Sequence, residues 1–139
     1  MGMFSAFDIS ASGLTANRVW MDVIADNIAN AETTHTTEGG PYRRRQVQFS
    51  TILGSSSDPS LSQGQGVRVA GITQDQSALR LVYNPGHPDA RADGYVEMPN
   101  VNAVTEMVDM MVASRAYEAN TTAMETSKGM VTRTLDILR

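Results

Sequence analysis

Both ends of the chain carry hydrophobic side chains that recur every seven residues. From Phe4 to about Asn30 the repeat consists of Phe7, Leu14, Met21 and Ile28. From Ala103 to Leu138 it consists of Met110, Tyr117, Met124, Val131 and Leu138. Such spacing places side chains on one face of a helix, and a seven-residue stripe is typical of left-handed helix pairing. We therefore predict two long helices that pair along these residues.

The boundaries of the two helices are marked by residues that disfavour a helix. The first helix is followed by a threonine cluster over 33–37 and by Gly39-Gly40-Pro41. Pro99 precedes the second helix, and Asn100 or Asn102 is its candidate cap. We assign Asn27, Asn30 and Asn120 to hydrogen bonds between helices or at helix ends, although each could also cap a turn or face water.

The hydrophobic period changes to two between the helices. Short strands are predicted around four groups: Val47 and Phe49; Val67 and Val69; Leu79, Leu81 and Tyr83; Tyr95 and Glu97. A Ser/Gly-rich stretch over 54–66 is predicted to be a mobile loop. The chain thus divides into an N-terminal helix over 1–35, a small β-rich middle domain over 36–98 and a C-terminal helix over 99–139. We expect an α+β fold in which the terminal helices form an antiparallel or coiled-coil-like α domain.

The lengths of these parts predict an exposed helix surface. The middle domain should form a globule roughly 25 to 30 Å across, whereas the C-terminal helix would be about 54 Å long. The helix therefore extends past the globule, and its stripe must be covered by the N-terminal helix and by other chains. This favours a structural subunit of a larger assembly.

Composition removes several classes of function. The 139 residues include 11 basic and 15 acidic side chains, so the net charge of −4 does not favour binding to a phosphate backbone. The chain has no cysteine, which excludes disulfides, thiolate metal sites and thiol nucleophiles. We expect no cleavable signal peptide and no direct membrane insertion, because acidic residues interrupt both apolar segments.

Short motifs in the chain leave two other classes of function open. His87 and Asp89 could belong to a small metal-dependent enzyme, but His35 and His87 do not have the spacing of a recognised ligand pair, and a polar surface turn is the simpler interpretation. Arg43-Arg44-Arg45 could bind nucleic acid, although three charges are few and alternate sides in a strand. No glycine-rich phosphate loop or G-x-S-x-G motif occurs, so no catalytic residue and no cofactor is expected.

The helices also carry recognisable motifs. Asp26-Asn27-Ile28-Ala29-Asn30 followed by Thr33-Thr34 resembles the N-terminal signature of the flagellar axial proteins, which form the rod, hook and hook-filament junction. Further segments narrow the resemblance to the rod proteins: 4–14, 38–44, 83–89, 106–110 and 115–120. One departure is that Gly39-Gly40-Pro41-Tyr42 stands where most axial proteins have Gly-Tyr or Gly-Phe directly after the threonine.

The resemblance implies a structural subunit of the bacterial flagellar basal body, where the periplasm-spanning rod transmits motor torque. It implies export through the flagellar type III apparatus without a cleaved signal. The implied partners are copies of the chain, other rod proteins and the adaptor that joins the rod to the membrane ring. A helix face that meets a different face on the next copy would build an open helical tube. Another rod paralogue remains the alternative within the family.

Overall fold

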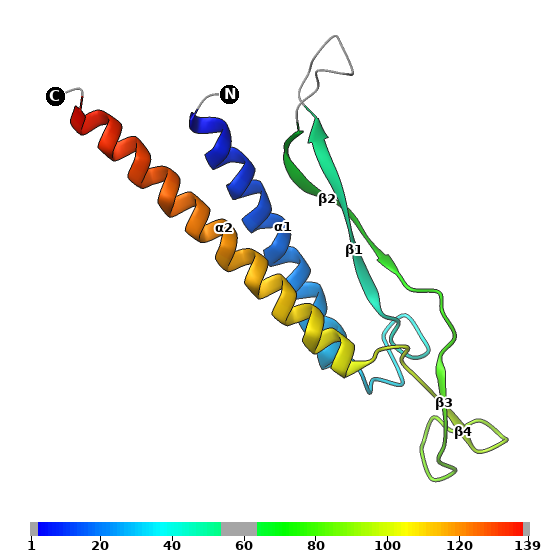
Figure 1. Cartoon of the computed structure of the whole chain (residues 1–139). Helices are drawn as coiled ribbons and strands as arrows, with labels where there is room; N and C mark the ends of the chain where they lie inside the picture. Colours follow the sequence, from blue (N-terminus) through cyan, green and yellow to red (C-terminus); the bar gives the residue numbers. More distant parts are fainter. Residues whose placement is uncertain (1–2, 54–63, 138–139) are drawn as a thin grey trace.

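The computed structural model describes residues 3–53 and 64–137 and contains two long helices and four strands (Figure 1). The helices are α1 (Met3–Ala29) and α2 (Ala103–Ile137). The strands are β1 (Arg45–Leu53), β2 (Gly64–Gln74), β3 (Arg80–Tyr83) and β4 (Tyr95–Met98). The predicted α+β class with two terminal helices and β-rich middle residues is confirmed.

The two helices lie side by side and run in opposite directions (Figure 1). Three contacts fix their register: Asn27 with Glu106, Met21 with Ser114, and Gly13 with Asn120. In antiparallel helices the numbers of facing residues add up to a constant, which here lies between 133 and 135. By this register Met3 lies opposite residues 130 to 132. The last turns of α2 therefore extend past the beginning of α1.

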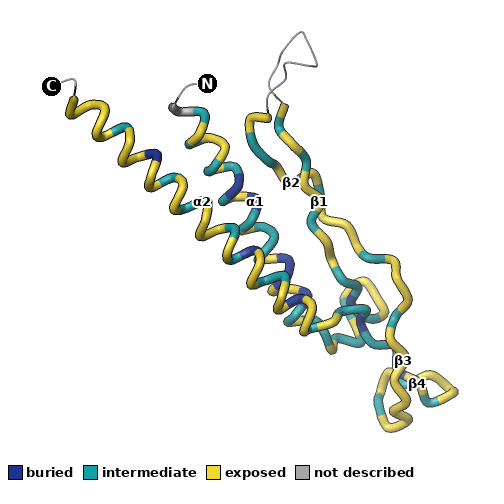
Figure 2. Tube along the Cα trace, viewed as in Figure 1, coloured by how far each residue is buried: buried dark blue, intermediate teal, exposed yellow. Residues whose placement is uncertain are grey.

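The β1–β2 hairpin lies along α1 on the side away from α2, so α1 is the middle layer (Figure 1). The two strands pair antiparallel, with irregularities between Gln48 and Phe49 and between Ile52 and Leu53. Burial follows this arrangement. Buried positions gather on α1 and near the junction of the helices with β1, whereas most of α2 is exposed (Figure 2). Ala16, Val23 and Ile24 of α1 are all buried.

Close contacts seat the hairpin on α1. The hydroxyl of Ser12 accepts a hydrogen bond from the backbone N–H of Val67 at 3.1 Å. Gly66 has a φ of 133°, and a Cβ at this position would collide with the Ser12 hydroxyl. Farther along, the rings of Trp20 and Phe49 meet edge to face with centroids 5.9 Å apart. Only a glycine thus lets β2 approach α1 this closely.

The middle residues form two separate two-stranded sheets instead of one globule. β3 pairs antiparallel with β4, and this hairpin projects from the end of the molecule where α2 begins (Figure 1). A two-stranded hairpin has little stability alone, which is why β1–β2 depends on α1 for its second layer. Of the predicted loop over 54–66, residues 54–63 lie outside the described residues, and Gly64 to Gly66 begin β2.

Two asparagines lie just before α2, and one of them caps the helix. Asn102 caps α2, because its Oδ1 accepts hydrogen bonds from the N–H groups of Val104 and Thr105. Asn100, the other candidate cap, instead accepts from the Arg44 N–H and donates to Ser77. It therefore joins the start of β1 to the segment between β2 and β3.

Candidate functional site

The seam between the helices is made by every third or fourth residue of α2. These positions are buried or half-buried, apart from Tyr117 at the edge with 37 % exposure: Glu106, Met110, Ala113, Tyr117, Asn120, Met124, Ser127 and Val131. Among the elements described, α2 packs against α1. The predicted stripe of α2 thus lies within the chain's own helix pair. Leu138, its last predicted member, lies outside the described residues.

The predicted stripe of α1 is half-buried at all four positions: Phe7, Leu14, Met21 and Ile28. Other residues of α1 are more completely covered, among them Val23 and Ile24 at 5 % and 2 % exposure. The reason is that α1 has neighbours on two sides, α2 and the β1–β2 hairpin. A single seven-residue stripe does not describe a helix that is buried from both sides.

Gly13 of α1 and Asn120 of α2 meet at a close contact between the two helices. A Cβ on Gly13 would lie 3.1 Å from both the Nδ2 and Oδ1 atoms of Asn120. The Asn120 amide donates to the carbonyl of Ala116 in its own helix at 2.9 Å. Asn120 therefore lies in the seam, but its described hydrogen bond stays within α2. The helices approach closely here because Gly13 has no side chain.

Asn27 is the centre of a buried polar junction between α1, α2 and β1. Its Nδ2 donates to Glu106 Oε2 at 2.9 Å and to the carbonyl of Arg45 at 2.8 Å. Its Oδ1 accepts from the Arg45 N–H and from the Tyr42 hydroxyl, both at 2.9 Å. Asn27 is 1 % exposed, and both ends of its amide are fully used. One side chain thus fixes two helices and a strand relative to one another.

Glu106 adds a buried negative charge to this junction. It is 1 % exposed, and its Oε1 accepts a hydrogen bond from Arg44 Nε. The Nη2 of the same guanidinium donates to Asp109 Oδ2 at 3.3 Å, so Arg44 bridges two carboxylates one turn apart on α2. A buried carboxylate is tolerated when it is paired and hydrogen-bonded. Glu106 meets both conditions.

Tyr42 closes the junction from the loop before β1. Burial raises the pKa of its phenol above the ordinary value of 10.0, and the nearby carboxylates of Asp26 and Glu106 act in the same direction. The guanidinium of Arg45 lies 5.7 Å from the ring centroid and lowers the pKa, but less than burial raises it. The neutral hydroxyl is therefore kept as a donor to Asn27.

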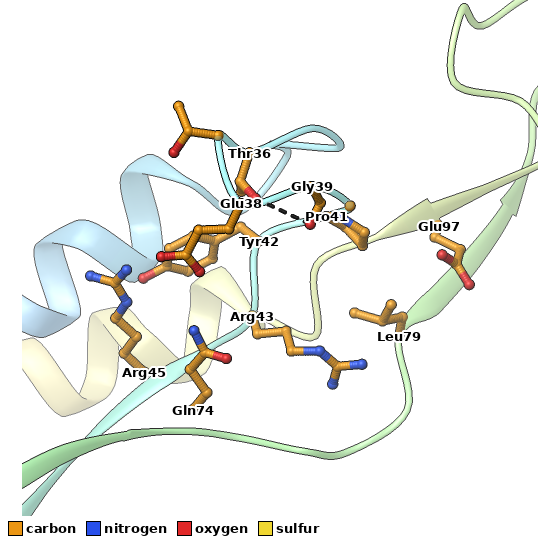
Figure 3. Close-up of a pocket in the computed structure, with 12 residues that line it drawn as sticks. Thr36, Glu38, Gly39, Pro41, Tyr42, Arg43, Arg45, Gln74, Leu79 and Glu97 are labelled. Atoms are coloured by element: carbon orange, nitrogen blue, oxygen red, sulfur yellow. Dashed lines mark hydrogen bonds between the residues drawn. The ribbon is translucent and has the colours of Figure 1, made fainter.

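The arginine run does not form one basic surface. Arg44 is occupied by Glu106 and Asp109, while Arg43 donates to the backbone carbonyls of Asp75 and Ser77. Arg43 and Arg45 line a hollow of about 480 Å³ that also contains Glu38 and Glu97. Figure 3 shows the two guanidinium groups pointing in different directions. This mixture of charges does not offer the continuous positive patch that a phosphate backbone requires.

His87 and Asp89 form a local turn. The backbone N–H of Asp89 donates to His87 Nδ1 at 3.1 Å, and Asp89 Oδ2 accepts from the Thr34 hydroxyl at 2.8 Å. The lone pair of Nδ1 is thus used within the turn. Among the described residues, no three histidine, aspartate or glutamate side chains are grouped to hold a metal ion. No helix within residues 3–53 and 64–137 is long and apolar enough to cross a bilayer.

The three asparagines assigned from the sequence have different partners. Asn27 bonds to the opposite helix, and Asn30 bonds at the end of α1, where it donates to the Asp26 carbonyl and accepts from Thr33. Asn120 bonds to its own helix. Sequence reasoning missed Glu106, Arg44 and Tyr42 as partners of Asn27. The sequence carried one signal for this junction: Glu106 stands four residues before Met110, at the spacing of the side chains that face α1.

Comparison with known proteins gives matches at both ends and over the full length. Residues 7–34 match the family described as flagella basal body rod protein, and residues 92–137 match the C-terminal family of the flagellar basal body rod FlgEFG proteins. The chain is 48 % identical to the flagellar basal-body rod protein FlgC of Borreliella burgdorferi, covering 100 % of this chain and 99 % of the relative. It is 47 % identical to FlgC of Bacillus subtilis, covering 99 % of each chain. It is 42 % identical to FlgC of Salmonella typhimurium, covering 99 % of this chain and 98 % of the relative.

Proposed function

The chain belongs to the FlgC family of flagellar basal-body rod proteins, and we propose that it joins its neighbours through its terminal helices and transmits motor torque along the rod. Its place is the flagellar basal body, where it is a structural subunit of the rod. A rod that turns as a shaft needs subunits whose parts do not shift against one another. The junction around Asn27 supports this role, because it locks both helices and β1 together.

The observation that carries the proposed mode of assembly is the exposure of α2. One face of this helix is covered by α1, and the opposite face carries large apolar side chains that none of the residues described in the structure covers. Contiguous exposed apolar patches mark interaction sites. A coiled-coil-like pair of helices with one bare face is suited to packing against further helices of the same kind.

The partners that we propose are copies of this chain, other rod proteins and the adaptor that joins the rod to the membrane ring. We further propose that the chain reaches the periplasm through the flagellar type III export apparatus. The relatives are structural rod proteins. The mechanical role requires no catalytic residue and no cofactor, and we propose none.

The proposal is tested by replacing the gene in its own bacterium with an epitope-tagged copy. We expect the tag in purified basal bodies and normal swimming, whereas deletion of the gene should abolish rods and motility. A strain lacking the flagellar export apparatus should retain the tagged protein in the cytoplasm. A swimming deletion strain, or basal bodies without the tag in swimming cells, would contradict the assignment to the rod.

A further inference from the structure

The β3–β4 hairpin stands apart from the rest of the molecule. Among the described helices and strands, β3 and β4 pack only against each other (Figure 1). The Asn84 N–H donates to the Gly94 carbonyl at 3.0 Å and extends their ladder by one pair. Hydrogen-bonded and non-hydrogen-bonded pairs alternate between antiparallel strands. Val82 therefore bonds to β4, whereas Leu81 and Tyr83 direct their backbone groups to the outer edge of β3.

This outer edge of β3 is open. Leu81 and Tyr83 each present one N–H and one C=O there, and no described residue bonds to these four groups. The two residues are 54 % and 64 % exposed. β3 contains no proline, and its register with β4 has no bulge, although proline and bulges are common ways to block an edge. The edge is therefore available to a further strand.

Outward-facing backbone groups at two other edges are occupied by the chain itself. On β4, the N–H of Tyr95 donates to Asp93 Oδ1 at 3.3 Å, and its C=O accepts from the Arg91 N–H at 2.9 Å. On β1, the amide of Asn27 bonds to both backbone groups of Arg45. The open groups of β3 are thus an exception to how the chain treats these edges.

One face of the hairpin is apolar and exposed. Leu81 and Tyr83 point to the same side of β3, and Tyr95 lies opposite Tyr83. The two tyrosine rings meet edge to face with centroids 5.3 Å apart. On the other face Val96 is buried. A two-stranded sheet has little stability alone, and a third strand would extend this apolar face by placing its alternate side chains beside Leu81 and Tyr83.

The first residue of β3 adds a charge to the edge. Arg80 is exposed and forms no ion pair with a described residue. It lines a hollow of about 400 Å³ together with Glu32, Val101 and Val104, among others, and Glu32 forms no ion pair with it. The nearby Arg91 is already paired with Glu97. A carboxylate on an added strand would supply the counterion that Arg80 lacks.

We propose that the outer edge of β3 binds an extended segment of another rod protein as a third strand. The inference rests on the proposed function and names one surface that it uses. The segment runs antiparallel to β3, which is the slightly more stable direction, and bonds to all four outward groups. It carries apolar side chains beside Leu81 and Tyr83 and an acidic one opposite Arg80. Main-chain bonds give such strand addition its affinity, and alternate side chains give it specificity.

A second copy of β3 is a poorer occupant of this edge. Two identical strands that pair antiparallel are related by a two-fold axis, so their contact closes as a dimer. If the outward groups of both copies pair, Leu81 of one lies opposite Tyr83 of the other. Arg80 then lies opposite Asn84 and still has no counterion. A segment of a different protein meets both requirements.

Hydrogen exchange of single amides tests the contact in the full chain and in purified basal bodies. In the dilute chain, the outward amides of Leu81 and Tyr83 should exchange freely, whereas that of Val82, which bonds to β4, should exchange more slowly. In basal bodies the two outward amides should slow by about a hundredfold or more. Fast exchange of both in basal bodies that contain the chain would overturn the strand addition and leave the rod assignment standing. Absence of the unmodified chain from basal bodies would overturn both.

A proline at the edge tests the same bonds in the cell. Leu81→Pro removes an outward N–H and keeps the hydrogen bonds between β3 and β4, because an edge strand accepts proline where its N–H faces solvent. Leu81→Ala is the matched control, because it shortens the side chain and keeps the N–H. NMR of the Val82–Val96 pair checks the hairpin in both variants.

Rod yield and swimming of Leu81→Pro should fall about tenfold or more, whereas Leu81→Ala should stay within about threefold of the unmodified chain. Normal rods from Leu81→Pro would overturn the proposal, and an equal loss in both variants would show a side-chain contact in place of strand addition. If the proline variant loses its hairpin, the exchange of the two outward amides in unmodified basal bodies decides.

Photocross-linking identifies the occupant of the edge. A benzophenone side chain in place of Tyr83, which is itself aromatic and exposed, should link in basal bodies to a segment of a different rod protein. Mass spectrometry of the linked peptides should find apolar residues at alternate positions followed by an acidic one. Links to β3 of a second copy, or to a helix of a neighbour, would overturn the proposed third strand.

Discussion

Asn27 of α1 donates a hydrogen bond to Glu106 Oε2 of α2 at 2.9 Å, although 79 residues separate them along the chain. The Asn27 amide also pairs with both backbone polar groups of Arg45 at the start of β1. This contact holds the base of the helix pair and the β1–β2 hairpin at one point. The rigidity of the subunit should depend on it.

Replacing Asn27 by alanine should strongly destabilise the chain. The change leaves Glu106 and Tyr42 with one hydrogen bond fewer in a buried site, and unsatisfied buried groups each cost about 1 to 3 kcal/mol. We expect a loss of about 2 to 4 kcal/mol in the free energy of unfolding, measured in urea. Asn30→Ala is the control, because its bonds are at the exposed end of α1. An equal loss in both variants would show that the junction has no special weight.

The ion pair between Arg44 and Glu106 should show strong coupling in a double-mutant cycle. Glu106→Ala leaves a partly buried guanidinium with only Asp109, and Arg44→Ala leaves a buried carboxylate without its cation. Because each single change removes the same contact, we expect a coupling energy of about 1 to 3 kcal/mol. Glu118→Ala, at an exposed position of the same helix, should change stability by less than about 0.5 kcal/mol. Additive losses from Arg44 and Glu106 would refute the pairing.

The two glycines within the helices should respond differently to alanine. A Cβ at Gly129 meets nothing within 4 Å, so Gly129→Ala should stabilise α2 by up to about 1 kcal/mol. The same Cβ at Gly13 would press on Asn120, and the gain from helix propensity should be lost to crowding of the seam. Thermal unfolding of both variants measures the difference. Adding Asn120→Ala should restore the gain at Gly13, and equal gains without it would contradict the close approach.

Stability should fall at alkaline pH through Tyr42. Burial raises the pKa of the Tyr42 phenol, so the folded chain holds this proton to a higher pH than the unfolded chain, whose phenol has the ordinary pKa of 10.0. A raised pKa gives stability that is present below pH 10 and is lost as pH rises through the pKa of the folded state. Tyr42→Phe should remove this part of the pH dependence, which denaturant titrations from neutral to alkaline pH can measure. If the free energy of unfolding of Tyr42→Phe falls with rising pH as steeply as that of the unmodified chain, another titrating group causes the effect.

Hydrogen exchange should divide α2 into a protected and an unprotected part. In the dilute chain, amides from Asp109 to Asn120 should be protected because α1 covers one face of this part, whereas those from Gly129 to Ile137 should exchange fast. The end of the helix has few buried contacts and contains a glycine, which lowers helix stability. In assembled rods the same amides should become protected. Uniform protection of α2 in the dilute chain would show that its end is stable without partners.

The sequence alone was enough to predict the helices, the strands and the family. The seven-residue repeats and the change to period two depend on local geometry, which each segment carries within itself. The cap at Asn102 and the turn around His87 and Asp89 are local features as well. The motifs over 26–34 and 106–120 led to the flagellar axial proteins, and relatives 42 to 48 % identical over the full chain bear this out.

Only the tertiary structure decided how these elements face one another. Met110, Met124 and Val131 are half-buried on α2, which packs against α1, and the exposed apolar side chains at the start of α2 lie on its opposite face. No sequence pattern identified the partners of Glu106, which is buried because Asn27 and Arg44 reach it from distant segments. Periodicity specifies a face of one helix, whereas burial depends on which neighbours the chain folds against it. That choice is made by contacts between residues far apart in sequence, which no local pattern records.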